Sequence, residues 1–301
     1  MRALRYSEYG GPEVLAVGEA PDPHAGPGQV RIVVRASSVN PVDYKVRSGA
    51  MGGDPAALPR IPGVDAAGVV DEVGSGVDGV AVGDAVLGLG SATAAELAVL
   101  TDFTAKPEGL SWVEAAALPL GAETAARALD LLGVAEGMTL LVEGAAGGVG
   151  SAAVQLAVAR GATVIGTASE RNHDYLRELG AEPTTYGEGL VERVRELAPG
   201  GVDAVLDTAG KGSLPELVQL VDVPAQVVSI ADFSAPELGA RVTSGGKRAA
   251  YALAEAVRLH GEGRYTVQVE RTFPLAEGAE AHRLSETGHV RGKLVLVVSE
   301  D

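Results

Sequence analysis

The chain has 301 residues, of which 46% are hydrophobic and 21% are charged, so it can bury a large core in one or two domains. Its 24 basic and 40 acidic residues give a net charge of −16, which disfavours nucleic acid and anionic membranes as partners. The absence of cysteine excludes disulfides and thiolate zinc sites. Because no apolar run reaches about 18 residues and the N-terminus lacks a signal-peptide pattern, we expect a cytoplasmic protein without membrane spans.

The first part of the chain, residues 1–118, contains short strand-like runs separated by turns rich in glycine and proline. This pattern is typical of a mostly antiparallel, barrel-like β unit. The strand-like runs are 30–35, 68–73 and 84–89, and the turns lie at 10–12, 25–28 and 61–63.

In residues 119–250 the pattern changes, because apolar strand-like runs alternate with helix-length segments. This alternation predicts βαβ units and a doubly wound parallel sheet. The expected strands are 139–142, 162–165, 203–206 and 226–230, and the expected helices are 121–132, 149–160, 171–179 and 188–197.

The last part of the chain, residues 251–301, is expected to return to the first domain and complete it. A helix-like run at 249–259 is followed by strand-like runs at 265–269 and 293–298. The pattern alone does not prove that these strands close the first sheet.

The segment from Gly144 to Gly150 reads Gly-Ala-Ala-Gly-Gly-Val-Gly and lies between a predicted strand and a predicted helix. In this context dinucleotides bind with their pyrophosphate at the helix N-terminus. Gly147 would let the backbone approach the pyrophosphate, and Gly150 would let the helix pack closely on the strand. The strict G-x-G-x-x-G pattern is not met, because Ala145 occupies the first glycine position. A tight turn without a ligand is the alternative, but the surrounding βαβ pattern favours a dinucleotide site.

The end of the next predicted strand bears on the choice between NADH and NADPH. NAD-binding folds place an acid there, which grips the ribose 2′-hydroxyl. This strand ends instead at Ala168-Ser169, and Glu170 lies past its expected end. Ser169 can donate a hydrogen bond to a 2′-phosphate and Arg171 can supply positive charge. The alternatives are that Ser169 caps a helix and that Arg171 is a solvated first-turn residue. We favour NADPH, because nothing at Ala168 would repel the phosphate.

Several blocks of sequence, taken together and in order, carry a family resemblance. They are 36–49, 61–70, 80–86, 114–120, 144–150, 179–181 and 288–296. Over nearly its whole length the chain resembles the medium-chain dehydrogenases/reductases, and more narrowly their zinc-free quinone oxidoreductase branch, which includes zeta-crystallin. The resemblance implies a Rossmann-type domain at 119–250 and a GroES-like catalytic domain made of 1–118 and 251–301.

Zinc-dependent members of that family have Gly-His-Glu where this chain has Gly63-Val64-Asp65, and they supply metal-binding cysteines. Here Val64 stands at the histidine position, no cysteine exists, and the five histidines are scattered. We therefore expect no metal site.

The resemblance also implies that the nicotinamide lies in an interdomain cleft, near Asn40 and Asp43 of the Asn-Pro-x-Asp block. Some quinone reductases have a tyrosine two residues after this aspartate, whereas here Tyr44 follows at once and Lys45 takes the second position. Tyr44 and Lys45 are therefore candidates only for a proton donor. The alternatives are that Asn40 marks only a turn and that Asp43 is a surface or capping residue.

Ten residues match cofactor contacts of the family. Thr124 lies near the start of a helix, where the family often has a threonine that contacts the cofactor, and Tyr186 matches a family tyrosine that lies close to the adenosine phosphate. Ile230 and Phe233 fall in a loop that borders the nicotinamide. The alternatives are that Thr124 bonds its own backbone and that Phe233 is a core residue. The full set is Thr124, Ala146, Gly147, Gly148, Val149, Ser169, Arg171, Tyr186, Ile230 and Phe233.

The resulting functional hypothesis is a zinc-free enzyme that takes hydride from NADPH and reduces a small-molecule quinone or an α,β-unsaturated carbonyl. An enoyl-thioester reductase of a biosynthetic pathway is the first alternative, and the net charge of −16 speaks mildly against the basic entry that a carrier phosphate needs. A non-catalytic NADPH-binding protein is the second alternative. A homodimer is an expectation that rests on the family alone.

Overall fold

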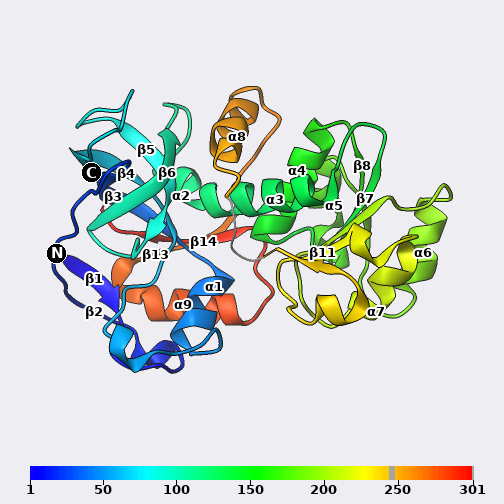
Figure 1. Ribbon diagram of the computed structural model, residues 1–301, viewed down its shortest axis with the longest axis horizontal. Helices are drawn as coiled ribbons and strands as arrows, with labels where there is room; N and C mark the ends of the chain where they lie inside the picture. The colour runs from blue at the N-terminus through cyan, green and yellow to red at the C-terminus, as the bar shows by residue number, and fades with distance from the viewer. Residues whose placement is uncertain (244–247, 300–301) are drawn as a thin grey trace. The chain divides into compact units, whose positions relative to one another are not determined.

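In the computed structural model the chain folds into two compact units (Figure 1). The first contains residues 1–120 and 267–301, and the second contains residues 121–266. The structure describes residues 1–243 and 248–299. Each unit has its own sheet and its own apolar core.

The second unit is built on a six-stranded parallel sheet with the order β12-β11-β10-β7-β8-β9. This order, with the first strand in the middle, is that of the Rossmann fold. The four central strands are short, mostly apolar runs whose side chains are mostly buried, as expected for a sheet covered on both faces. The strands of this sheet are β7 (Thr139–Glu143), β8 (Thr163–Thr167), β9 (Glu182–Thr184), β10 (Ala204–Asp207), β11 (Val227–Ser229) and β12 (Arg241–Val242).

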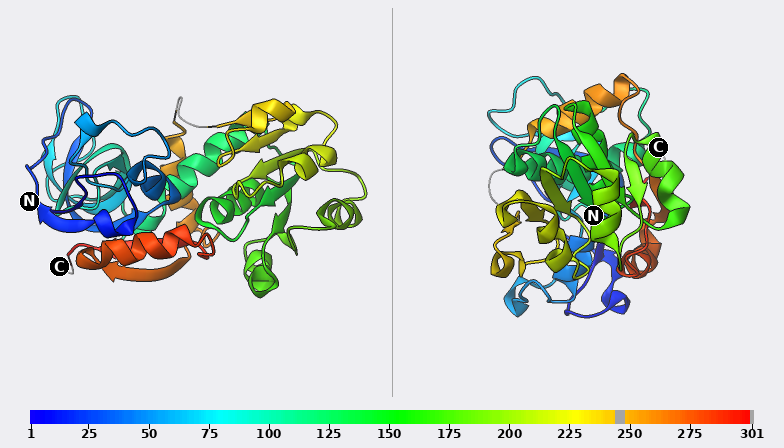
Figure 2. Two further views of the ribbon diagram at one scale, coloured as in Figure 1. Left: turned by 90° about the horizontal axis from the view of Figure 1, so that it is seen from below. Right: turned by 90° about the vertical axis from the view of Figure 1, so that its right-hand side faces the viewer.

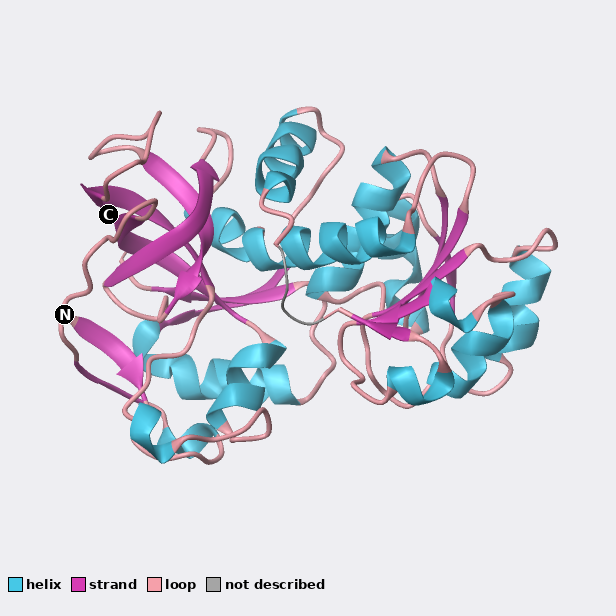
Figure 3. Cartoon of the chain, viewed as in Figure 1, coloured by secondary structure: helices cyan, strands magenta, loops and turns pink. Residues whose placement is uncertain are grey.

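Helices lie on both faces of this parallel sheet (Figure 3). One apolar cluster joins Leu141 and Val205 of the sheet to Leu190 and Leu217 of two helices. No helix in residues 1–243 and 248–299 is both long and apolar enough to span a membrane. The helices of the second unit are α3 (Pro119–Leu132), whose first two residues belong to the first unit, α4 (Gly148–Ala159), α5 (His173–Glu178), α6 (Leu190–Leu197), α7 (Leu214–Leu217) and α8 (Tyr251–Gly261).

The first unit contains a six-stranded sheet with the order β13-β14-β3-β4-β5-β6. Strands β13 and β14 are parallel, and the other neighbours are antiparallel. Strand β3 also pairs with β6, which closes the four strands β3 to β6 into a small barrel. Val30, Ile32 and Val34 alternate along β3 and are buried in the barrel core. The strands of this unit are β1 (Arg2–Arg5), β2 (Ala16–Glu19), β3 (Val30–Val39), β4 (Asp65–Val73), β5 (Ala85–Ser91), β6 (Leu97–Ala105), β13 (Val269–Pro274) and β14 (Lys293–Val297).

The helices of the first unit pack beside its sheet. Helix α9 contacts α1 and β14, and it lies alongside β13 (Figure 2). Leu4, Phe273 and Leu296 belong to a second apolar cluster, in the first unit. The helices are α1 (Pro41–Arg47), α2 (Trp112–Ala117) and α9 (Gly278–Glu286). Short 3-10 helices in the two units are η1 (Pro12–Val14), η2 (Pro55–Ala57), η3 (Glu170–Asn172), η4 (Val218–Leu220), η5 (Pro224–Gln226), η6 (Ala235–Leu238) and η7 (Leu275–Glu277).

The predicted fold class, a doubly wound parallel sheet with a mostly β domain, is confirmed. The predicted strand at 265–269 is wrong, because β13 begins only at Val269. The backbone of Thr266 forms hydrogen bonds with the side chain of Gln155 and not with a neighbouring strand. Thr266 N donates to Gln155 Oε1 at 2.6 Å, and Gln155 Nε2 donates to Thr266 O at 3.1 Å. Those two groups are therefore not available to a strand ladder.

Helix α8 belongs to the second unit, whereas we expected the chain to return to the first domain from residue 251. Tyr251, at the start of α8, donates a hydrogen bond to Asp130 Oδ2 of α3 at 2.7 Å. Arg160 of the C-terminal end of α4 bonds both partners, at 3.1 Å to Tyr251 Oη and 2.9 Å to Asp130 Oδ1. These contacts hold α8 against the helices of the Rossmann-type sheet.

Candidate cofactor and catalytic sites

The glycine loop lies between β7 and α4, where the sequence places it. Gly144 has a φ of +76°, which favours glycine, and Gly147 N donates to Gly144 O at 3.1 Å. Ser151 N then bonds Gly147 O at 2.8 Å, as the first turn of α4 closes. The amides of residues 148–150 precede the first hydrogen bond within α4, so they have no acceptor inside the helix and lie at the positive end of its dipole. This end of α4 can therefore receive an anion such as a pyrophosphate.

Two glycines of the loop differ in what surrounds them. A Cβ at Gly150 would lie 2.3 Å from Gly144 O and 2.7 Å from Ala145 Cα, so the close packing of α4 on the loop requires glycine. A Cβ at Gly147 would touch only Gly144 O, at 3.4 Å, and its φ of −77° suits any residue. The protein itself thus has room for a side chain at Gly147. A glycine at this position instead leaves space for a pyrophosphate to approach the backbone, as in dinucleotide-binding loops.

The candidate 2′-phosphate residues follow two adjacent parallel strands. Strand β8 ends at Thr167, and Ala168 N donates to Thr184 O of β9 at 3.0 Å, so both strands end at one edge. Ser169 precedes η3 without capping it through its side chain, and its Oγ accepts a bond from Asn172 Nδ2 at 3.3 Å. Arg171 and Tyr186 are both exposed beyond this edge. No acid ends β8, because its last residue is Thr167 and the next is the buried Ala168; the edge is thereby left open to a phosphate.

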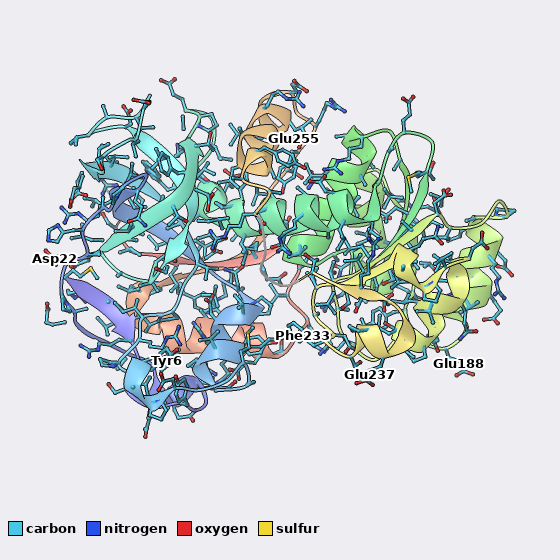
Figure 4. All side chains as sticks on the ribbon, in the orientation of Figure 1. Tyr6, Asp22, Glu188, Phe233, Glu237 and Glu255 are labelled. Atoms are coloured by element: carbon cyan, nitrogen blue, oxygen red, sulfur yellow. The ribbon has the colours of Figure 1, made fainter. Side chains whose placement is uncertain are left out.

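The remaining candidate cofactor residues lie on α3 and after β11. Thr124 is buried, and its hydroxyl donates to Glu123 Oε2 at 3.3 Å. A Cβ at Gly121, one helical turn earlier, would lie 3.0 Å from Gly148 O, so this part of α3 adjoins the glycine loop. Ile230 is half-buried after β11, and Phe233 is 54% exposed (Figure 4). Phe233 is therefore not a core residue.

Asn40 and Asp43 start helix α1 in the first unit, and both are buried. Asp43 Oδ2 accepts from Asn40 N at 2.8 Å, and Asp43 Oδ1 accepts from Gly63 N at 3.1 Å. Burial raises the pKa of Asp43 to about 7, although these two backbone donors favour the charged form. Asp43 thus caps α1, the alternative we left open, and also fixes the loop before β4.

Asn40 belongs to a second polar network around Asp65, the first residue of β4. Asn40 Nδ2 donates to Asp65 Oδ1 at 2.8 Å, and Leu120 N donates to Asp65 Oδ2 at 3.1 Å. Lys293, the first residue of β14, donates to Asn40 Oδ1 and reaches Asp65 Oδ2 at 3.5 Å. Both the Nδ2 and the Oδ1 atoms of Asn40 are therefore bonded, which holds the side-chain amide in one orientation.

Tyr44 and Lys45 lie on α1 and are half-buried, so both side chains are partly accessible to solvent. Burial raises the pKa of Tyr44, with a smaller contribution from the charge of Glu286. Its hydroxyl therefore keeps its proton at neutral pH and remains a hydrogen-bond donor.

Helix α1 is fastened to α9 by the guanidinium of Arg47. This buried side chain bonds His282 Nδ1 at 3.1 Å and also Glu286. Burial, and secondly the charge of Arg47, lower the pKa of His282 to about 3, so this histidine is a neutral acceptor. The position of Tyr44 and Lys45 therefore depends on α9, more than 200 residues away in sequence.

Among residues 1–243 and 248–299, no three histidine, aspartate or glutamate side chains gather in a way that could hold a metal ion. Val64 occupies the position at which zinc-dependent members of the resembled family carry a histidine, and its neighbour Asp65 bonds Lys293.

Comparison with known proteins identifies the family. Residues 26–106 match the model of the alcohol dehydrogenase GroES-like domain, and residues 179–296 match the model described as zinc-binding dehydrogenase. The chain is 34% identical to the NADPH-dependent alkenal/one oxidoreductase of Arabidopsis thaliana, over 98% of this chain and 79% of that protein. It is 37% identical to the quinone oxidoreductase of Rattus norvegicus, over 81% and 77% of the two chains. The chain belongs to the medium-chain dehydrogenase/reductase family.

Within this family the chain falls in the quinone oxidoreductase branch, as the resemblance implied. The structure of the Escherichia coli quinone oxidoreductase complexed with NADPH has a TM-score of 0.86 to this reductase, with 26% identity over 99% of this chain and 100% of that one. The second family model refers to zinc, but this member has no cysteine to serve as a ligand.

Sequence reasoning did not single out Asp65, Lys293 or Glu143 as functional candidates. All three are buried charged residues at the ends of strands. Asp65 and Lys293 lie inside blocks of the family resemblance; Asp65 stands within an apolar run, and Lys293 immediately precedes one. A charged residue in a run that is otherwise buried was the available signal.

Proposed function

We propose that this protein is an NADPH-dependent oxidoreductase that reduces a quinone or the C=C bond of an α,β-unsaturated carbonyl without zinc. Its likeness to NADPH-dependent alkenal/one and quinone oxidoreductases over most of their length supports this reaction class. The observation that carries the proposal is made at the carboxyl edge of the parallel sheet. There the glycine loop follows β7, and the adjacent strand β8 ends without an acid.

The second unit is the cofactor domain in this proposal. The amides at the start of α4 receive the pyrophosphate next to Ala146, Gly147, Gly148 and Val149. Ser169, Arg171 and Tyr186 recognise the 2′-phosphate, since all three follow β8 and β9 at one edge. Thr124, Ile230 and Phe233 border the rest of the cofactor.

The first unit is the catalytic, GroES-like domain, completed by the C-terminal residues of the chain. When bound, NADPH supplies a hydride, and one proton completes the reduction to the hydroquinone or the saturated carbonyl. Asn40 and Asp43 hold the start of α1. In this proposal Tyr44 and Lys45, which are partly accessible on that helix, deliver the proton or bind the carbonyl oxygen. A cytoplasmic location and a homodimer are further parts of the proposal.

The test measures oxidation of NADPH and of NADH by the purified protein with 1,4-benzoquinone, 9,10-phenanthrenequinone and a simple enone. We expect turnover with NADPH, and we expect Arg171→Ala to raise the KM for NADPH about tenfold while leaving that for NADH unchanged. The matched control is Arg177→Ala on α5, whose side chain pairs with Asp174 and is 54% exposed. No oxidation of NADPH with any acceptor would overturn the proposal. An unchanged KM in the Arg171 variant would remove that residue from the site.

A further inference from the structure

A buried carboxyl group ends the strand that leads into the glycine loop. Glu143 is the last residue of β7, is 3% exposed, and its Oε2 accepts a hydrogen bond from Thr167 Oγ1 at 2.8 Å. Thr167 is the last residue of the adjacent strand β8 and is fully buried. Thr167 Oγ1 in turn accepts from Gly144 N at 3.0 Å. A threonine hydroxyl has one hydrogen, so its donation to Glu143 turns a lone pair towards Gly144.

This relay from Gly144 through Thr167 to Glu143 acts on the first residue of the loop. Ala145 N also donates to Thr167 O, at 3.0 Å, and Thr208 Oγ1 donates to Glu143 O at 2.6 Å. The first turn of α4 rests on Gly144, as the 2.3 Å approach of a Cβ at Gly150 to Gly144 O shows. The position of Gly144 therefore sets the direction in which the N-terminal amides of α4 point.

The charge of Glu143 does not favour an anionic cofactor. Asp207 lies opposite Glu143 in the parallel register of β10 and β7, and Glu216 adds a further negative charge. Burial raises the pKa of Glu143, and Asp207 raises it further, whereas the bond from Thr167 lowers it. What Glu143 offers the loop is a fixed acceptor oxygen, and a neutral glutamine can supply the same oxygen.

We propose that Glu143 is a positioning residue for the cofactor, which holds the glycine loop in its binding form through the hydroxyl of Thr167. The inference rests on the proposed binding of NADPH by this loop. In this inference Glu143 affects NADPH binding through the position of its acceptor oxygen. It does not contact the phosphates itself.

The test is the dissociation constant of NADPH, measured by fluorescence titration of the full-length protein, together with KM and kcat for quinone reduction. Glu143→Leu and Thr167→Val should each weaken NADPH binding about tenfold, with kcat changed less than about threefold. Glu143→Gln should bind NADPH within about threefold of the unaltered protein, because its carbonyl oxygen still accepts from Thr167. The double variant Glu143→Leu/Thr167→Val should be no weaker than its worse parent, because both changes break one relay.

Asp203→Ala provides the matched control, since Asp203, which immediately precedes β10, accepts through its Oδ2 from Thr139 N at 2.7 Å, at the opposite end of β7 from Glu143. This variant should lower the melting temperature but leave NADPH affinity unchanged. If Glu143→Leu does not fold, Thr167→Val and Glu143→Gln decide the question. Unaltered affinity in both Glu143→Leu and Thr167→Val, or an equal loss in Asp203→Ala, would overturn the inference alone. An unaltered protein that binds no NADPH would overturn the proposed function and this inference with it.

Discussion

Lys293 Nζ lies 3.5 Å from Asp65 Oδ2 in the interior of the first unit, although 228 residues separate the two in sequence. The same ammonium donates to Asn40, the residue that precedes α1. Strand β14, near the end of the chain, is thereby tied to β4 and to the start of the helix that carries Tyr44 and Lys45. The last strand of the fold thus helps to place the candidate catalytic side chains.

Removal of the Lys293 charge should destabilise the protein strongly. Lys293→Met leaves the carboxylate of Asp65 buried without its cation, which we expect to lower the free energy of unfolding by about 3 to 5 kcal/mol. Denaturant unfolding followed by circular dichroism measures this change. Lys45→Met, on the same unit but half-buried, should cost less than about 1 kcal/mol. Equal stabilities of the two variants would contradict the buried ion pair.

Deprotonation of Asp43 should lower the free energy of unfolding as the pH rises from about 4 to 7. Its pKa is about 7 in the folded protein against an ordinary value of 3.8, so the folded state holds a proton that the unfolded state has lost between these values. The contribution of Asp43 is therefore full below about pH 4 and is lost as pH rises to 7, by at most about 1.4 kcal/mol per pH unit. Relative to Asp43→Asn, the unaltered protein should lose stability over this range and level off above it.

The difference between the two proteins is the required measurement, because His282 acts in the opposite direction. Its pKa falls from 6.5 to about 3, so the unfolded state binds the extra proton and stability is lost as pH falls below 6.5. His282 is present in both proteins and cancels in the comparison. A difference that does not change between pH 4 and pH 7 would contradict the assignment to Asp43.

Two glycine substitutions should separate folding from cofactor binding. Gly147→Ala has room in the protein and should leave the melting temperature unchanged, but it should weaken NADPH binding about tenfold because its methyl group meets the pyrophosphate. Gly150→Ala should lower both, since its Cβ would lie 2.3 Å from Gly144 O. Calorimetry and fluorescence titration measure the two properties. Full NADPH affinity in Gly147→Ala would place the pyrophosphate elsewhere.

The candidate proton donors should matter more for one substrate class than for the other. Hydride addition to an enone leaves an enolate that must be protonated, whereas a reduced quinone is acidic and needs less help. If Tyr44 donates the proton, Tyr44→Phe should lower kcat for an enone at least about tenfold and change that for 9,10-phenanthrenequinone much less. Lys45→Met makes the corresponding test of the neighbouring side chain. Equal losses for both substrate classes would show that the residue has a structural role.

The parts of the fold that follow local pattern could be predicted from the sequence. The βαβ alternation and the Gly144–Gly150 loop locate β7, β8 and α4 to within one or two residues. Helix α1 is not among the predicted helices, although proline at the first helical position and an acid two residues later are helix-start signals. The prediction of a strand at 265–269 is wrong because the side chain of Gln155, in α4, forms hydrogen bonds with the backbone of Thr266.

The polar networks could not be predicted from the sequence. Whether Lys293 pairs with Asp65, or Arg47 with His282, depends on which strands and helices meet, and no local pattern contains that information. Glu143 looked like the end of a strand, and its relay to Gly144 exists only because β8 lies beside β7. Local pattern predicted where the cofactor loop is, and tertiary packing decides what holds it in place.

The most direct test of the central claim is the ratio of kcat/KM for NADPH to that for NADH, measured with 9,10-phenanthrenequinone on protein dialysed against a metal chelator. We predict turnover that the chelator does not reduce and a preference for NADPH of at least about tenfold, because β8 ends without an acid and Ser169 and Arg171 follow it. A preference for NADH, or activity that is lost on chelation and restored by zinc, would contradict the account.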